Sequence, residues 1–241
     1  MNAIGVAAPT LVVSGMTPLT TIDFPDHLAC VLYTQGCSLR CRYCHNPQLI
    51  PTATADPGLA WEEIDHFLQR RQGLLEAVVF SGGEPCLQPA LAEAMSAVKA
   101  RGFKVGLHTA GVSPGRLASV LPLVDWVGLD VKAPAHRYQQ VTGRRHQART
   151  NRHSLQLLLD SGVAFECRTT LDWRLFSAEE TCQLAQELAD LGVTRYAIQI
   201  NQGRQCLDPE LEQPVILPGG QLTALQQTMQ KLFPVFEWRE G

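Results

Sequence analysis

Three closely spaced cysteines are the strongest candidate for a chemically active site in this sequence. Cys37, Cys41 and Cys44 are separated by three and then by two residues, in a segment that runs from Gly36 to Pro47. Thiolates are the usual ligands of iron–sulfur clusters, and electron-transfer clusters are normally closed by four cysteines. Three thiolates on a four-iron cluster leave one iron without a protein ligand. The spacing therefore predicts a metal-binding loop with an open iron to which a substrate can bind.

A zinc site is the alternative interpretation of the same loop. Structural zinc takes four nitrogen or sulfur ligands, and His45 would complete a Cys3His set. However, His45 directly follows Cys44 and would be strained to reach the same ion, and the chain has no second Cys-x-x-Cys pair to close the site. This alternative predicts a zinc-stabilised binding protein. The other cysteines stand alone, which favours buried thiols. They are Cys30, Cys86, Cys167, Cys182 and Cys206.

Gly82, Gly83 and Glu84 form a second candidate site, directly after an apolar run that ends at Ser81. Glycine has no side chain, so its backbone polar groups can approach a ligand closely. The Glu84 carboxylate can accept hydrogen bonds from an ammonium group. A tight turn between a strand and a helix is the other interpretation, since short glycine motifs also occur without a ligand.

Asp130 and Lys132 form a third candidate site. They are two residues apart at the end of an apolar run, so their side chains lie on the same face if the strand continues. A buried ion pair without a ligand is the alternative. Further polar residues lie at the ends of later strands, as candidates for the pocket wall or for ordinary structural roles. They are Arg168, Thr169, Thr170 and Gln199.

The elements that must position these residues alternate along the chain, which is typical of an α/β fold. The predicted strands are His27–Gln35, Ala77–Ser81, Lys104–His108, Trp126–Val131, Ala164–Thr170 and Tyr196–Ile200. The predicted helices are Trp61–Arg71, Pro89–Arg101, Pro114–Leu121, Thr150–Ser161, Ala178–Leu191 and Gly220–Leu232. These strand-then-helix units imply a parallel sheet, either doubly wound or curled into a closed or partly closed barrel. Both carry their chemistry at the carboxyl ends of the strands.

The cysteine spacing, with an aromatic residue, Tyr43, before the last cysteine, resembles the signature of the radical S-adenosylmethionine (radical SAM) superfamily. The resemblance implies a partial (β/α)6 barrel of the TIM type and one 4Fe-4S cluster held by Cys37, Cys41 and Cys44. It also implies that the amino and carboxylate groups of S-adenosyl-L-methionine (SAM) bind the open iron. The number of predicted strands agrees with this fold.

The resemblance implies roles for two loops. Main-chain groups around Tyr43 and His45 are expected to contact the adenine of SAM. Gly82, Gly83 and Glu84 resemble the family's GGE motif, which binds the amino group of the methionine part.

It also implies roles at the ends of two later strands. Asp130 and Lys132 resemble the Asp-x-Lys segment of glycyl-radical activating enzymes, where Lys meets the methionine carboxylate and Asp helps to hold a monovalent cation. Thr109 matches the family's Thr-x-Gly position. His108 stands where better-known activating enzymes carry Asp, so a second carboxylate for the cation is missing.

Within the superfamily, residues 19–26, 33–47 and 131–134 resemble the activating proteins of anaerobic ribonucleoside-triphosphate reductases. No cysteine lies between Cys44 and Cys86, so the chain lacks room for the ferredoxin-like insert of some other activating enzymes. The resemblance implies an oxidoreductase that cleaves SAM reductively and makes a glycyl radical on the reductase. An electron donor such as flavodoxin or ferredoxin is expected. The alternative is a radical SAM enzyme that acts on a small molecule or RNA.

Length and charge bound the remaining possibilities. The 241 residues carry 20 Lys plus Arg and 23 Asp plus Glu, a formal net charge of −3 that provides no general attraction to nucleic acid or anionic lipid. The first basic residue is Arg40, so the apolar start lacks the positive region of a secretory signal. No apolar run approaches the about 18 residues of a membrane span. We expect a cytoplasmic protein with reduced thiols.

Two regions complete the expectations. Residues 1–25 are expected to form an N-terminal extension that packs on the barrel, and residues 26–241 a single radical SAM domain. Between His136 and His153 the chain carries five arginines and no acidic residue. The ordinary interpretation of this stretch is a solvent-exposed loop followed by the start of a helix. The more specific interpretation is a docking surface for an acidic partner.

Overall fold

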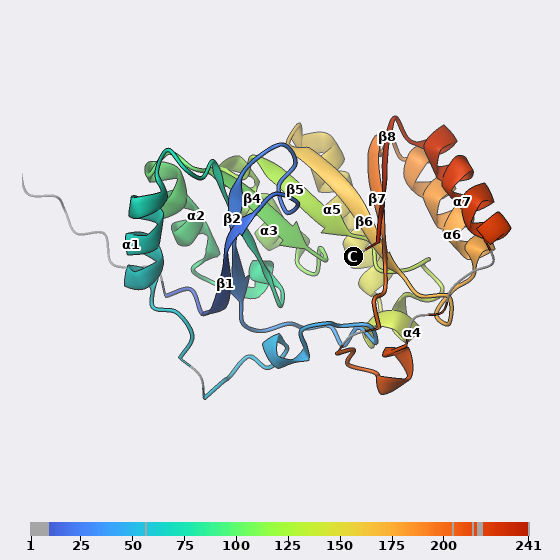
Figure 1. The fold of residues 1–241 in the computed structure, drawn as a ribbon, viewed down its shortest axis with the longest axis horizontal. Coiled ribbons are helices and arrows are strands. Elements are labelled where there is room, and N and C mark those ends of the chain that lie inside the picture. Colours follow the sequence, from blue (N-terminus) through green and yellow to red (C-terminus); the bar gives the residue numbers. More distant parts are fainter. Residues whose placement is uncertain (1–9, 56, 204, 214, 216–218, 241) are drawn as a thin grey trace, which may run out of the picture.

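The computed structural model describes residues 10–55, 57–203, 205–213, 215 and 219–240. Its described part contains one eight-stranded sheet whose strands follow one another in chain order (Figure 1). The strands are β1 (Val13–Thr20), β2 (Ala29–Thr34), β3 (Ala77–Gly82), β4 (Lys104–Thr109), β5 (Trp126–Asp130), β6 (Ala164–Leu171), β7 (Arg195–Ile200) and β8 (Val235–Arg239). The strands β2 to β8 are parallel, and β1 is antiparallel to β2.

Helices connect the parallel strands. They are α1 (Trp61–Arg71), α2 (Leu91–Ala100), α3 (Pro114–Val120), α4 (Tyr138–Thr142), α5 (Gln147–Ser161), α6 (Ala178–Asp190) and α7 (Gly219–Leu232). The six predicted strands correspond to β2 through β7, and the six predicted helices to α1, α2, α3, α5, α6 and α7, with boundaries that differ by up to three residues.

The strand order decides between the two sheet types that the periodicity left open. A doubly wound sheet reverses its order at a switch point, which places helices on both faces. Here each crossover advances the sheet by one strand in the same direction, so the helices lie on one side and the sheet curls around the other. Within the described residues, β1 and β8 each pair with one neighbour, so the barrel stays open. The predicted partial barrel is confirmed.

Strands β1 and β8 and helix α4 were not predicted. Strand β1 contains Gly15 and Pro18, which weaken a strand signal, and it pairs at the sheet edge with two irregular steps in register. In β8, Glu237 and Arg239 interrupt the apolar run. Helix α4 has only five residues, too few for a helical period to show. The domain boundary at residue 25 stays a prediction, although β1 is part of the sheet.

Two apolar clusters fix the sheet. The larger one packs the outer face against the helices, with fully buried Leu32, Phe80 and Leu107 on neighbouring strands. The smaller one fills part of the barrel interior around Phe24, which contacts Trp126 of β5 with their rings 5.6 Å apart. Phe24 follows β1, so the N-terminal segment closes one end of the barrel interior.

Among the described residues, no helix combines the length and the apolar character needed to cross a bilayer.

Candidate active site

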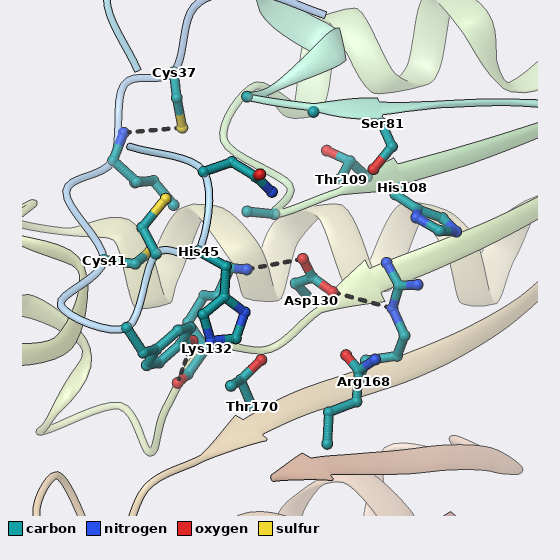
Figure 2. Close-up of a pocket in the computed structure, with 18 of the residues that line it drawn as sticks. Cys37, Cys41, His45, Ser81, His108, Thr109, Asp130, Lys132, Arg168 and Thr170 are labelled. Carbon is teal, nitrogen blue, oxygen red and sulfur yellow. Dashed lines mark hydrogen bonds and ion pairs between the residues drawn. The ribbon is translucent and has the colours of Figure 1, made fainter. Parts of the chain in front are cut away.

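A cavity of about 440 Å³ lies at the carboxyl ends of the parallel strands (Figure 2). All three cysteines of the triplet line it, together with polar side chains from β4, β5, β6 and β7. Predicted site residues in its wall are Cys37, Cys41, Cys44, Tyr43, His45, Gly82, Gly83, Thr109, Asp130 and Lys132. The structure thus brings together all of the predicted residues except Glu84, which lies behind the wall.

The cysteine loop is held from two distant parts of the chain. The backbone N–H of Arg40 donates to the carbonyl oxygen of Thr142 at 2.8 Å, at the end of α4. On the other side, the N–H of Leu207 donates to the carbonyl oxygen of Cys44 at 3.0 Å. Figure 1 shows the loop crossing the open end of the barrel to reach these segments. These contacts hold the thiols over the strand ends.

Burial favours the protonated form of the Cys37 and Cys41 thiols when no metal is bound. It raises the pKa of Cys41 to about 12 and also raises the pKa of Cys37. The positive charge of Lys132 opposes the effect at both thiols. A metal binds thiolates and therefore releases protons here, so cluster loading is coupled to pH.

The residues present fit a cluster with several irons. Among the described residues, no three His, Cys, Asp or Glu side chains come close enough together to hold a single metal ion. A four-iron cluster takes its three thiolates on three separate irons, and it also accepts hydrogen bonds at its sulfurs. Ser38, between the first two cysteines, has a buried hydroxyl without a partner among the described residues. It is a donor available to such a cluster.

Gly82 and Gly83 allow the turn after β3 to lie directly against the cysteine loop. A side chain at Gly83 would begin 2.4 Å from the carbonyl oxygen of Gly36, and one at Gly82 would begin 2.4 Å from the backbone nitrogen of Thr34. Gly82 also has a φ of 109°, which other residues rarely adopt. The two glycines therefore have a packing role as well as a place in the pocket wall.

Glu84 is 1% exposed, and its oxygens accept hydrogen bonds from the protein itself. Oε1 accepts from the Thr109 hydroxyl at 2.6 Å and from the Cys86 N–H at 3.1 Å, and Oε2 accepts from the Ala110 N–H at 2.8 Å. Burial raises its pKa against the effect of these donors. In this arrangement Glu84 positions the end of β4, including Thr109. Its direct contact with an ammonium group stays a prediction.

Asp130 and Lys132 face the cavity as an ion pair, as their spacing predicted. Lys132 Nζ lies 2.8 Å from Asp130 Oδ2, and Arg168 Nε from β6 lies 3.1 Å from Asp130 Oδ1. Burial opposes ionisation of Asp130, but Lys132 and then Arg168 outweigh it and lower the pKa to about 2. Figure 2 shows the carboxylate between the two basic side chains. Asp130 is therefore ionised at neutral pH.

His108 is a neutral group of the cavity wall. Its Nε2 lies 2.9 Å from the carbonyl oxygen of Asp23, in the segment after β1, so this nitrogen carries the proton and donates. Burial, followed by the charge of Arg168, lowers the pKa of His108 to about 3. His108 therefore provides no positive charge to the site. It also provides no carboxylate, unlike the Asp that better-known activating enzymes carry at this position.

Tyr43 and His45 border the cavity on the side of the cysteine loop. The Tyr43 hydroxyl donates to the carbonyl oxygen of Lys132 at 3.3 Å, and Lys132 Nζ lies 5.9 Å from the centre of the Tyr43 ring. His45 Nε2 lies 2.8 Å from Asn201 Oδ1, beyond the end of β7. Their side chains are thus fixed by protein contacts. Backbone hydrogen bonds engage Arg42 and Cys44, so the backbone groups of Tyr43 and His45 are the ones that a ligand could use.

Several wall residues were missed or only mentioned in the sequence analysis. Arg168, Thr170 and Gln199 line the cavity as their strand-end positions suggested, whereas Thr169 donates its hydroxyl to Val131 instead. Asp23 was not a site candidate because its contact with His108 joins segments 85 residues apart.

The arginine-rich stretch divides into paired and unpaired residues. Arg137 pairs with Glu180 at 2.8 Å and Arg152 with Glu187 at 3.4 Å. Arg144, Arg145 and Arg149 are exposed, and no acidic side chain in the described part of the chain forms an ion pair with them. We call these three residues the basic rim. They follow α4, which contacts the cysteine loop.

Comparisons with known proteins agree with the cysteine loop and the cavity described above. Residues 31–172 match the model of the radical SAM superfamily. A candidate glycyl-radical enzyme activating enzyme of Methanocaldococcus jannaschii is 30% identical over 207 residues, which cover 83% of this chain and 84% of that protein. The pyruvate formate-lyase-activating enzyme of Clostridium pasteurianum is 36% identical over 129 residues, which cover 51% of this chain and 53% of that enzyme.

Solved structures share the fold. QueE from Escherichia coli has a TM-score of 0.56 at 16% identity, with 96% of this chain and 94% of that chain covered. SuiB from Streptococcus suis, bound to S-adenosylmethionine, has a TM-score of 0.64 at 14% identity. That match covers 88% of this chain and 50% of SuiB, so the chain spans about half the length of SuiB.

Proposed function

Because the chain belongs to the radical SAM superfamily and, within it, to the glycyl-radical enzyme activating enzymes, we propose that it generates a glycyl radical on an anaerobic ribonucleoside-triphosphate reductase. The observation that carries the activity is the cavity itself, in which three thiols face an ionised Asp130 and Lys132. The zinc-stabilised binding protein is set aside, because the family match covers the cysteine loop and identifies an enzyme.

The proposed roles follow from where each group lies. Cys37, Cys41 and Cys44 would hold a 4Fe-4S cluster, which would supply the electron for reductive cleavage of bound SAM to methionine and a 5′-deoxyadenosyl radical. The cysteine loop lies over the strand ends, where it would limit the access of water to the reacting atoms. Main-chain groups near Tyr43 and His45 are proposed to hold the adenine.

The methionine end of SAM is proposed to lie between β3 and β5. Lys132 Nζ carries the charge that would meet the methionine carboxylate, and it is only 16% exposed. Backbone groups of Gly82 and Gly83 would approach the amino group, with Glu84 either accepting from it or fixing Thr109 beside it. No acid–base pair is needed, since the step is a homolytic cleavage followed by hydrogen abstraction.

Two observations support the reductase as the target. The chain carries no cysteine between Cys44 and Cys86 and thus lacks an insert for additional clusters. The segments 19–26 and 131–134, which carry the resemblance to the reductase activating proteins, both contribute to the cavity, through Asp23 and Lys132.

The basic rim is the proposed docking surface for this target. Its three arginines lack acidic partners among the described residues, in a chain whose formal net charge is −3. A local positive patch steers an acidic partner even when the net charge does not. The electron donor is proposed to be a small redox protein such as flavodoxin or ferredoxin. The proposed compartment is the cytoplasm, consistent with eight free cysteines.

Electron paramagnetic resonance of the target tests the proposal. The protein with a reconstituted cluster, SAM and a reductant are mixed anaerobically with anaerobic ribonucleoside-triphosphate reductase, and in parallel with pyruvate formate-lyase. We expect a stable glycyl radical on the reductase, matched by formation of 5′-deoxyadenosine. A radical on pyruvate formate-lyase alone would keep the activating class and reject the target.

A small-molecule substrate is the second candidate, because a 7-carboxy-7-deazaguanine synthase of Methanopyrus kandleri is also 33% identical over 120 residues, which cover 42% of this chain. In that case 5′-deoxyadenosine would accumulate together with consumption of a metabolite, while no glycyl-radical enzyme would acquire a signal.

A further inference from the structure

Asp130 carries two cationic partners, one on each oxygen. Lys132 Nζ lies 2.8 Å from Oδ2, and Arg168 Nε lies 3.1 Å from Oδ1. The Arg168 side chain is only 8% exposed, so its interaction is not diluted by solvent. The carboxylate to which the resemblance assigns a monovalent cation is thus already engaged by two protein charges.

The backbone of β5 makes room for this guanidinium. A side chain at Gly128 would begin 2.6 Å from Arg168 Cζ and 2.7 Å from Nη2. Arg168 Nη2 also donates to the Gly128 carbonyl oxygen at 3.3 Å. Any residue larger than glycine would therefore displace the guanidinium. Arg168 lies opposite Asp130 in the register of β6 and β5, and the missing side chain at Gly128 leaves room for its guanidinium over β5.

In the described structure the cavity wall has one other carboxylate, that of Asp23, and it is already engaged within its own turn. His108 occupies the place where better-known activating enzymes carry Asp, and its Nε2 donates to the Asp23 carbonyl oxygen at 2.9 Å. Hard cations such as Na⁺, K⁺ and Mg²⁺ prefer oxygen ligands. The Asp23 carboxylate accepts the hydroxyl of Thr20 at 2.6 Å within its own turn. The residues present therefore do not fit a monovalent cation at Asp130.

We propose that the Arg168 guanidinium is the resident cation of this site and takes the place of a soluble monovalent ion. It holds one oxygen of Asp130, so that the other oxygen orients Lys132 toward the SAM carboxylate. This inference rests on the proposed SAM contact of Lys132. A guanidinium is charged at every physiological pH and is tethered to β6, so the site needs no ion from solution.

The first test uses the wild-type protein with its cluster reconstituted. SAM affinity is measured by isothermal titration calorimetry in KCl, in NaCl and in choline chloride at one ionic strength, since choline is too large for an ion site. We expect the three dissociation constants to agree within about twofold. Affinity that is about tenfold higher in K⁺ or Na⁺ than in choline would overturn the inference.

The second test removes the guanidinium. Arg168→Gln should weaken SAM binding in choline by about tenfold or more, and K⁺ or Na⁺ should restore most of the loss, because an ion can now occupy the vacated space. The SAM affinity of Arg168→Lys in choline chloride should stay closer to that of the wild type. Arg116→Gln, which removes an exposed guanidinium that donates to the Leu87 carbonyl oxygen, is the matched control.

Each outcome decides the question. An Arg168→Gln protein with wild-type affinity in choline, or with a loss that no cation restores, would contradict the proposal. If this variant does not fold, the wild-type salt series still decides, and the thermal unfolding midpoint of Arg168→Lys in the three salts adds a readout independent of SAM. Failure of the wild type to bind SAM in any salt would instead reject the proposed function.

Discussion

Lys132 holds a positive charge in a position that is mostly shielded from water. Burial alone would lower its pKa, but the negative charge of Asp130, the first of the groups that oppose burial, raises the pKa well above the ordinary value. The ammonium is therefore permanently charged at neutral pH. A carboxylate that enters the cavity meets it without a proton transfer.

Lys132→Ala should weaken SAM binding while leaving the cluster assembled. Loss of a charge-assisted hydrogen bond costs about 1.5–3 kcal/mol, or roughly ten- to hundredfold in affinity. Isothermal titration of the reconstituted protein measures the change, with Lys99→Ala, which removes a surface ion pair with Asp125, as control. Unchanged affinity would remove Lys132 from the methionine site.

Each cysteine of the triplet should be required for the cluster. Cys37→Ala, Cys41→Ala and Cys44→Ala should each abolish SAM cleavage and reduce the iron content, because the described cavity wall contains no further thiol that could replace the lost ligand. Cys182→Ala, a half-buried thiol on α6, is the matched control and should retain both. Iron analysis and 5′-deoxyadenosine assays give the answer, and a triplet variant with full iron and activity would refute the ligand assignment.

His108 should make the fold sensitive to acid. Its pKa is lowered from 6.5 to about 3, so unfolding at pH values between these limits takes up a proton. The contribution of neutral His108 to stability is complete above pH 6.5 and declines as the pH falls toward 3, by up to about 1.4 kcal/mol per pH unit. His108→Gln does not titrate and should lose less stability between pH 7 and pH 5. Denaturant unfolding at both values measures this, and equal losses in the two proteins would contradict it.

The sequence was sufficient to predict those site residues that lie close together along the chain. The cysteine spacing identified the metal loop, and the two-residue spacing of Asp130 and Lys132 placed both in the cavity because strands alternate their side chains. The third member of that group, Arg168, depends on which residue of β6 lies beside which residue of β5. Strand register is set by tertiary packing, so the contact of Arg168 with Asp130 could not be predicted.

At the scale of elements, β8 pairs with β7 through its backbone and also forms an ion pair with a residue of β6. Arg239 Nη2 of β8 lies 2.9 Å from Glu166 Oε2 of β6, and Glu166 is fully buried at 0% exposure. A buried carboxylate is tolerated when a cation compensates it. The last strand is therefore fixed by a contact that crosses β7.

Arg239→Met should destabilise the protein by about 3–5 kcal/mol, since it leaves Glu166 buried without its cation. The double variant Glu166→Gln with Arg239→Met should recover much of this loss. Glu237→Gln removes only the partly exposed partner of Arg239 and should cost less than about 1 kcal/mol. Urea unfolding of the three variants measures the differences. An equal loss in the single and double variants would show that the charge of Glu166 is not the cause.

The elements could be predicted where one periodicity dominates. Strands β2 and β3 are apolar on both faces for most of their length. Helix α1 was predicted with its observed bounds because its buried residues Trp61, Ile64 and Leu68 repeat at helical spacing. Strand β8 alternates apolar Phe236 and Trp238 with charged residues, a pattern that could have indicated it. In β1, two residues that weaken strands concealed the pairing, which depends on β2.

At the scale of the molecule, charge is unevenly distributed. The basic rim lies beside the cysteine loop, whereas the arginines of α1 lie at the opposite end of the molecule in Figure 1. A partner drawn to the rim would approach the open end of the barrel. The strand order, which the periodicity could not predict, creates this arrangement by placing α4 next to the loop.

Reversal of charge in the rim should slow activation of the target without changing the radical chemistry. The variant with Arg144→Glu and Arg145→Glu should activate the reductase about tenfold more slowly at low salt, and the difference should shrink as salt screens the charges. Cleavage of SAM without a target should stay unchanged. Arg70→Glu with Arg71→Glu on α1 is the control of equal charge. Equal activation rates for the two variants would remove the rim from the docking surface.

The two anchors of the cysteine loop have a consequence for the biosynthesis of the protein. The last cysteine of the triplet is made about 160 residues before Leu207, whose N–H holds the loop. Before that point the loop has only its backbone contacts with segments up to Thr142. At about 5–20 residues per second, this delay lasts on the order of ten seconds or more on the ribosome. During that time the thiols are present without the closed loop. We therefore expect iron and sulfide to be delivered to a nearly finished chain, and the nascent thiols to be open to oxidation until then.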